Sequence, residues 1–129
     1  AGLAERQDQL WSPWVQRAEQ EFTCAFVRAT GIIHKAQPEA TLAAVRDLAL
    51  ELDDFRLAGL AFGASLFGSA ILAIGVLRGW LDGVQAYELS RLDEVYQEEK
   101  WGVDEEAAER TARLTIEARF LHDWFLALA

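Results

Sequence analysis

The sequence predicts an all-α fold, with one domain that spans residues 1–129. We expect about five helices, in an arrangement between an orthogonal array and a bundle, packed around a central apolar helix that contains glycine. Apolar residues recur at spacings of three and four along most of the chain, which is the helical period. The chain has 129 residues and is 52% apolar, so it can bury a core.

The first predicted helix has a proline near its start. Ser12-Pro13 fits an N-cap followed by proline at the first helical position. The periodicity fails from residue 24 to residue 37, and this stretch is predicted to be extended or a loop. The apolar face of this first helix is formed by Trp11, Val15, Ala18, Phe22 and Ala25, so its last residue lies at the start of the irregular stretch.

Two further helix starts follow in the middle of the chain. A second helix is expected to begin near Pro38, the other of the two prolines. Asp53-Asp54 then offers an N-cap for a third helix near Phe55. The predicted apolar stripe of the second helix consists of Leu42, Val45, Ala49 and Leu52.

An uncharged stretch of 21 residues, Leu57 to Leu77, is the candidate central helix. By length it could also cross a membrane. Single arginines, Arg56 and Arg78, bound it, and no one-sided basic cluster is present. The amphipathic helices around it need an apolar surface to cover, which favours a buried helix in a soluble protein without stable membrane insertion. The alternative is a membrane-associated helical subunit.

The last two predicted helices have clear boundaries. Asp82 and Gln85 are spaced as in a capping box, and this fourth helix is expected to run to Trp101 and stop at Gly102. Asp104 is the predicted N-cap of the fifth helix. Its stripe alternates spacings of four and three: Ala107, Thr111, Leu114, Ala118, Leu121, Phe125 and Leu128.

Residues that could carry chemistry are few and scattered. His34 and His122 are the only histidines, and Cys24 is the only cysteine. Neither histidine has the Glu-x-x-His spacing of metal sites in helical bundles. We therefore expect no enzyme, no metal and no cofactor. Glu88 lies on the axis of an apolar stripe, so it is either buried with a partner or placed at the edge and solvated.

The opposite face of the fourth helix is the candidate binding surface. Aromatic residues are enriched at protein interfaces, so Tyr87 and Trp101 on this charged face favour a protein-binding role. The alternative is that Tyr87 and Trp101 fold back onto their own domain. The net charge of -9 disfavours nucleic acid and anionic membranes as partners. The acidic run of residues 93–109 is either a solvated face or a surface that steers a basic partner. The face comprises Tyr87, Arg91, Glu94, Glu98 and Trp101.

Several segments together resemble one family. They are Gly68–Ala73, Leu81-Asp82, Ala86–Glu94, Gln97 and Trp101–Glu106. This pattern resembles the carboxy-terminal helical domain of the chaperones that assemble the catalytic head of ATP synthase by holding its alpha subunit. The resemblance is most specific from Ser69 to Ala108. That family also has a strand-rich amino-terminal domain, which this chain lacks, so we expect a truncated start.

The resemblance implies a non-catalytic chaperone, expected to be a monomer. It would bind the unassembled ATP synthase alpha subunit, prevent its aggregation and shield the surface that the beta subunit covers later. A generic protein-interaction module is the alternative. The alanine-rich, lysine-poor composition favours the bacterial cytoplasm over the mitochondrial matrix. The residues expected to contact the partner are Glu94, Gln97, Trp101, Tyr87 and Glu98.

Overall fold

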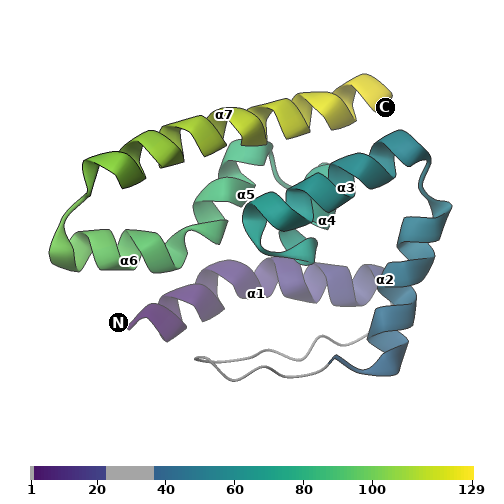
Figure 1. Cartoon of the computed structure of the whole chain (residues 1–129). Helices are drawn as coiled ribbons and strands as arrows, with labels where there is room; N and C mark the ends of the chain where they lie inside the picture. Colours follow the sequence, from purple (N-terminus) through teal and green to yellow (C-terminus); the bar gives the residue numbers. More distant parts are fainter. Residues whose placement is uncertain (1, 23–36) are drawn as a thin grey trace.

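A computed structural model describes residues 2–22 and 37–129, and within these residues the chain is all-α. The predicted irregular stretch, with Cys24, Ala25 and His34, lies outside the described residues apart from Gln37. Seven helices replace the five expected because two of the predicted helices are each divided (Figure 1). They are α1 (Leu3–Phe22), α2 (Glu39–Glu51), α3 (Asp54–Phe67), α4 (Ala70–Leu77), α5 (Gly83–Ser90), α6 (Leu92–Trp101) and α7 (Glu105–Leu128).

The uncharged stretch forms two helices, so the prediction of one continuous central helix is wrong. Gly68 ends α3 with a φ of +62°, a left-handed conformation that glycine adopts without a steric penalty. Ser69 then caps α4, where its hydroxyl accepts a hydrogen bond from the Leu72 amide at 3.2 Å. The turn lets α3 and α4 pack against each other. Among the helices that the structure describes, none is long and apolar enough to cross a membrane.

The predicted fourth helix is also divided, and its expected run to Trp101 is wrong. Arg91 separates α5 from α6, with φ -98° and ψ 11°. The Ser90 hydroxyl donates to the Tyr87 carbonyl oxygen at 2.6 Å, and such local bonds compete with the helical ladder. The break changes the direction of the chain, as Figure 1 shows, so α5 and α6 present different faces to their neighbours.

Pro13 lies inside α1, so its predicted place at a helix start is wrong. The helix begins ten residues earlier, at Leu3. Ser12 does not act as an N-cap, because its hydroxyl hydrogen-bonds the Asp8 carboxylate at 3.0 Å within the same helix. Proline has no amide hydrogen, so the carbonyl of Gln9, four residues earlier, lacks its helical partner. Pro13 and Gln9 are both exposed, and water can therefore solvate that carbonyl.

The other predicted helix boundaries are confirmed. Pro38 precedes α2, and the Asp53 carboxylate caps α3 by accepting from the Arg56 amide at 2.8 Å. This hydrogen bond and the Arg56 guanidinium lower the pKa of Asp53. Asp82 and Gln85 form the full capping box, with bonds of 2.7 and 3.0 Å. Gly102 ends α6 with a φ of +87°.

The core is formed where α3, α4, α5 and α7 meet. Three glycines allow this close approach. A Cβ built on Gly59 would lie 2.7 Å from the Phe125 ring, and one on Gly83 would lie 2.0 Å from the Ala118 carbonyl oxygen. The third glycine, Gly63, faces Leu121. The core includes Leu60, Phe67, Leu72, Ala73, Ile74, Val76, Leu81, Ala86, Ala118, Leu121 and Phe125.

The predicted stripes of α7 and α2 differ in outcome. Every residue of the α7 stripe is buried or half-buried, so this prediction is confirmed. In α2, Thr41 and Leu48 are the buried residues, while the predicted Leu42 is exposed. The apolar positions of α2 are spread around its axis, and the sequence alone therefore did not identify the face that packs.

Candidate protein-binding surface

Four of the five predicted binding residues share one face of α6. Glu94, Gln97, Glu98 and Trp101 are spaced by three, four and seven residues, which places them on the same side of a helix. We call these four residues the α6 surface. The other side of α6 packs on α1, where Arg6 forms an ion pair with Glu99 at 3.0 Å and also lies over the Tyr96 ring.

Two arginines hold the carboxylates of the α6 surface. Arg91 donates from Nε to Glu94 at 3.2 Å and from a terminal nitrogen to Glu98 at 2.8 Å. Arg110, on α7, approaches Glu94 at 3.9 Å. The Arg91 side chain is mostly covered, and its pair with Glu98 is partly buried, while its pair with Glu94 is exposed; the two pairs share one guanidinium. They therefore fix the orientation of the two carboxylates, which reduces the conformational entropy that a partner must remove on binding.

Tyr87 is buried, at 5% exposure, so the prediction that it lies on the exposed binding face is wrong. The break at Arg91 places Tyr87 on α5, under the Arg91 guanidinium, which lies 5.9 Å from the ring centroid. Burial raises the pKa of the Tyr87 phenol, while the positive charge of Arg91 opposes this shift. The Tyr87 phenol is therefore un-ionised at neutral pH.

Trp101 stands at the end of the α6 surface and is 81% exposed. Val103, in the turn between α6 and α7, is also exposed. A large aromatic side chain that is so little covered is a typical anchor for a partner protein. The possibility that Trp101 folds back onto its own domain is excluded.

Glu88 is exposed on α5, which settles the two alternatives that the sequence left open. The apolar stripe that surrounds it in sequence is divided between α5 and α6, so Glu88 lies at an edge. His122 is half-buried near Gly83, and its Nδ1 atom is buried and finds no hydrogen-bond partner among the described residues. Among the described residues, no group of three or more His, Cys, Asp or Glu side chains could hold a metal ion.

A second surface, which the sequence reasoning missed, lies between α3 and α7. The two helices run antiparallel, because Gly59 faces Phe125 and Gly63 faces Leu121. We call the space between them the aromatic groove. It has a volume of about 250 Å³ and is lined by Ala58, Gly59, Phe62, Phe120, Leu121 and Trp124. The aromatic residues that fall outside the predicted stripes were the available signal.

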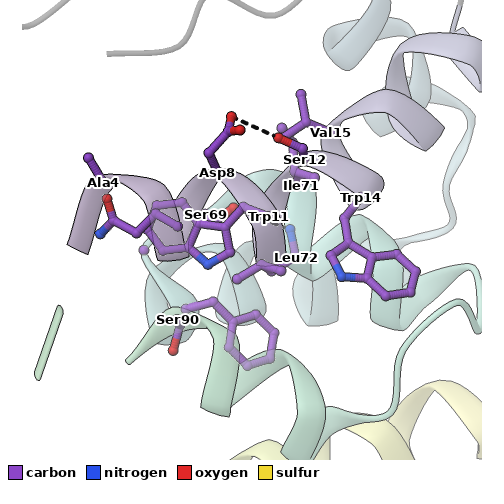
Figure 2. Close-up of a pocket in the computed structure, with 13 residues that line it drawn as sticks. Ala4, Asp8, Trp11, Ser12, Trp14, Val15, Ser69, Ile71, Leu72 and Ser90 are labelled. Atoms are coloured by element: carbon purple, nitrogen blue, oxygen red, sulfur yellow. Dashed lines mark hydrogen bonds between the residues drawn. The ribbon is translucent and has the colours of Figure 1, made fainter. Parts of the chain in front are cut away.

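A cavity lies between α1 and the turn that joins α3 to α4. It has a volume of about 520 Å³, and Figure 2 shows Trp11 and Trp14 of α1 beside Leu72 and Ser69. The Trp11 indole N–H donates to the Leu89 carbonyl oxygen at 2.8 Å, so this tryptophan ties α1 to α5. Asp8 and Ser12, joined by their hydrogen bond, also line the cavity.

Comparison with solved structures shows what the chain resembles. Atp12 from Paracoccus denitrificans superposes with a TM-score of 0.90 and 33% identity, over 95% of this chain and 53% of that chain. A point mutant of the same protein also gives 0.90, with 32% identity and the same two coverages. Atu1473 from Agrobacterium tumefaciens, a candidate chaperone, gives 0.89 and 34%, over 98% of this chain and 48% of that one.

The helical fold and these matches define the class of the chain, which is an all-α fold shared with about half of each of these solved structures. No protein-family model matches the chain. The chain has the fold of the Atp12 chaperone family. It spans about half the length of the solved structures that it matches.

Proposed function

We propose that this chain acts in the assembly of the proton-transporting ATP synthase, as a non-catalytic chaperone that binds the unassembled alpha subunit. The observation that supports this most is the match to Atp12. It covers 95% of this chain at 33% sequence identity, so the sequences as well as the folds are similar. The chain would be the carboxy-terminal helical domain of such a chaperone, and the resemblance of residues 69–108 to that family agrees with this.

The proposal has a physical basis in the exposed surfaces. An orphan subunit carries an apolar interface that aggregates until its true partner covers it. A chaperone must therefore offer apolar contact area and still release its client. The described part of the chain offers exposed aromatic residues on two separate surfaces, next to many carboxylates. The net charge of -9 would attract a basic client surface and speed the encounter.

We assign client contact to the α6 surface. Glu94 and Glu98 would pair with basic client residues, Gln97 would hydrogen-bond, and Trp101 would insert as an anchor. Tyr87 would act indirectly, by supporting Arg91. We further propose that α4, which contains Gly75 and contacts α1, α3, α5 and α7, is the centre around which the other helices pack. The chain would act as a monomer in a bacterial cytoplasm.

Co-purification with the recombinant alpha subunit tests the function. The chain should capture alpha subunit and suppress its aggregation, measured by light scattering, without nucleotide. A chain that leaves the scattering unchanged at a molar excess is not a holding chaperone for this client. Equal protection of unrelated aggregating proteins would favour the generic protein-interaction module instead.

Substitution on α6 tests the assigned surface. Glu94→Lys should weaken capture of the alpha subunit by about tenfold, because it reverses the charge that a basic partner meets. Asp93→Lys is the matched control, since Asp93 makes the same charge change in the same turn and lies on a different face. Equal capture by Glu94→Lys and the unmodified chain would reject the role of Glu94. A similar loss in both variants would show a long-range charge effect.

A further inference from the structure

The aromatic groove between α3 and α7 is an exposed feature lined by glycine and by apolar and aromatic side chains. Two rows of side chains border it at helical spacing, and each of the large ones is at least 44% exposed. A monomeric soluble protein rarely leaves such a contiguous apolar patch uncovered without a binding role. The rows are Phe55, Ala58 and Phe62 on α3, and Ile116, Phe120 and Trp124 on α7.

The floor of the groove contains a glycine that allows its two helices to pack closely. At Gly59 the missing side chain lets α3 approach α7, since a Cβ would lie 2.7 Å from Phe125 and 2.9 Å from Trp124. The Trp124 indole N–H donates to the Phe55 carbonyl oxygen at 2.9 Å, and the two rings lie 6.3 Å apart. One wall of the groove is therefore fixed in place before any partner arrives.

The shape and chemistry of the groove select among occupants. Its volume of about 250 Å³ is below the range of about 300–1,000 Å³ that is typical of small-molecule sites. An extended peptide would bring unpaired backbone N–H and C=O groups against an apolar surface, at a cost in free energy. A helix satisfies its own backbone, and two antiparallel helices leave a seat for a third one.

Charge selects further against a second copy of this chain. Each copy carries a net charge of -9, so two copies repel each other. Around the groove, Asp54 stands at the start of α3, while Glu117 and Asp123 flank Phe120 along α7. No ion pair involves these three carboxylates among the residues that the structure describes. Arg113 lies a turn before Glu117, and Arg119 lies on the side of α7 away from α3.

We infer that the aromatic groove binds an amphipathic helix of the client protein, whose apolar face seats on Phe62, Phe120 and Trp124 and whose flanks carry lysine or arginine. This inference rests on the proposed function and adds a second contact surface to it. The α6 surface and the aromatic groove involve different residues, so the client would be held at two places. Two-point attachment raises the overall affinity without requiring either contact to be tight, which suits a chaperone that must release.

Photo-crosslinking to recombinant alpha subunit tests the inference on the full chain. A benzoylphenylalanine at Phe120 should crosslink to alpha subunit, and mass spectrometry should map the crosslink to a helical segment flanked by basic residues. In parallel, Phe62→Ser with Phe120→Ser should weaken alpha-subunit binding by at least about tenfold. Leu126→Ser is the matched control, because Leu126 is 61% exposed on the other side of α7, and it should bind as the unmodified chain does.

The outcomes separate the inference from the function on which it rests. Normal alpha-subunit binding by the double serine variant would overturn the groove and leave the chaperone function standing. Crosslinks to a second copy of the chain, or to an extended or acidic client segment, would overturn the assigned occupant. An unmodified chain that fails to bind alpha subunit would reject the function and the groove together. Circular dichroism and urea unfolding of each variant exclude loss of fold as the cause.

Discussion

The two halves of α7 differ in what they contact, although they belong to one continuous helix. In the second half, Ala118, Leu121 and Phe125 are buried against α3 and α5. In the first half, the stripe residues Ala107, Thr111 and Leu114 are only half-buried. Figure 1 shows this half extending beyond α3, and its Arg110 approaches Glu94 of α6 at 3.9 Å.

The difference separates stability from recognition within one element. The second half contributes buried apolar area and contacts between backbones, which stabilise the fold. The first half and α6 carry most of their charge on exposed positions, where ion pairs contribute little to the free energy of unfolding. Substitutions in the packed half should therefore change stability most, and those beside α6 should change recognition with a small effect on stability. Four variants test this contrast, from the largest expected effect to the smallest.

Gly83→Ala should give the largest loss of stability. The new Cβ would lie 2.0 Å from the Ala118 carbonyl oxygen, which is a backbone atom and can move only if α5 and α7 separate. Overpacking of this kind costs about 3 kcal/mol or more. Urea unfolding measures it. Gly2→Ala is the control, because nothing lies within 4 Å of its Cβ position, and it should change stability by less than about 0.5 kcal/mol. Equal midpoints for the two variants would contradict the close packing of α5 on α7.

Gly59→Ala should cost less, about 1 kcal/mol. Its Cβ would meet ring atoms of Phe125 and Trp124 at 2.7 and 2.9 Å, and these are side chains that can shift, unlike a backbone carbonyl. Alanine also favours the helix relative to glycine, which offsets part of the cost. Tryptophan fluorescence should change together with the urea midpoint as Trp124 moves. A gain in stability would show that the groove wall is more mobile than its contacts indicate.

Arg91→Ala tests the expectation that substitutions beside α6 have a small effect on stability. The variant leaves Glu94 and Glu98 four residues apart without their shared cation. We therefore expect the free energy of unfolding, measured by urea unfolding, to fall by about 1 kcal/mol, and this loss should be smaller in high salt. Arg113→Ala is the control, since no ion pair of Arg113 is found among the described residues. A loss as large as that of Gly83→Ala would mean that the α6 region belongs to the stable core.

The parts of the fold that the sequence predicts are those with local causes. The capping box at Asp82 depends on residues three positions apart, and the α7 stripe depends on one regular period, so both are confirmed. The breaks at Gly68 and Arg91 were missed because apolar periodicity continues across them. At Gly68 a glycine followed by a serine N-cap was a local signal for the break, and it was overlooked inside the long uncharged stretch.

The candidate surfaces show the same limit. Trp101 was predicted on a charged face, and its high exposure agrees, because its neighbours on the helix determine that face. Tyr87 was assigned to the same face on the assumption of one straight helix, and the break at Arg91 makes that assignment wrong. The aromatic residues of the groove stood outside the predicted stripes, which was a signal, but the sequence did not show that they meet, since the two rows come from α3 and α7 and lie together only in the folded chain.

The pH dependence contributed by Tyr87 should be the smallest effect, and it lies at the boundary between the two regions. Burial raises the pKa of its phenol above the usual value of 10.0, so the folded state holds the proton more tightly than the unfolded state does. The free energy of unfolding is therefore unaffected below about pH 9 and falls as the pH rises through about 10. Tyr87→Phe keeps the ring under Arg91 and removes the titrating group, so its urea midpoint should fall less between about pH 9 and pH 11. Any hydrogen bond lost with the hydroxyl shifts the variant by a constant amount below pH 9 and leaves this difference in slope intact. Parallel curves for the two proteins would mean that the phenol reaches solvent, and that Arg91 is not supported by a buried ring.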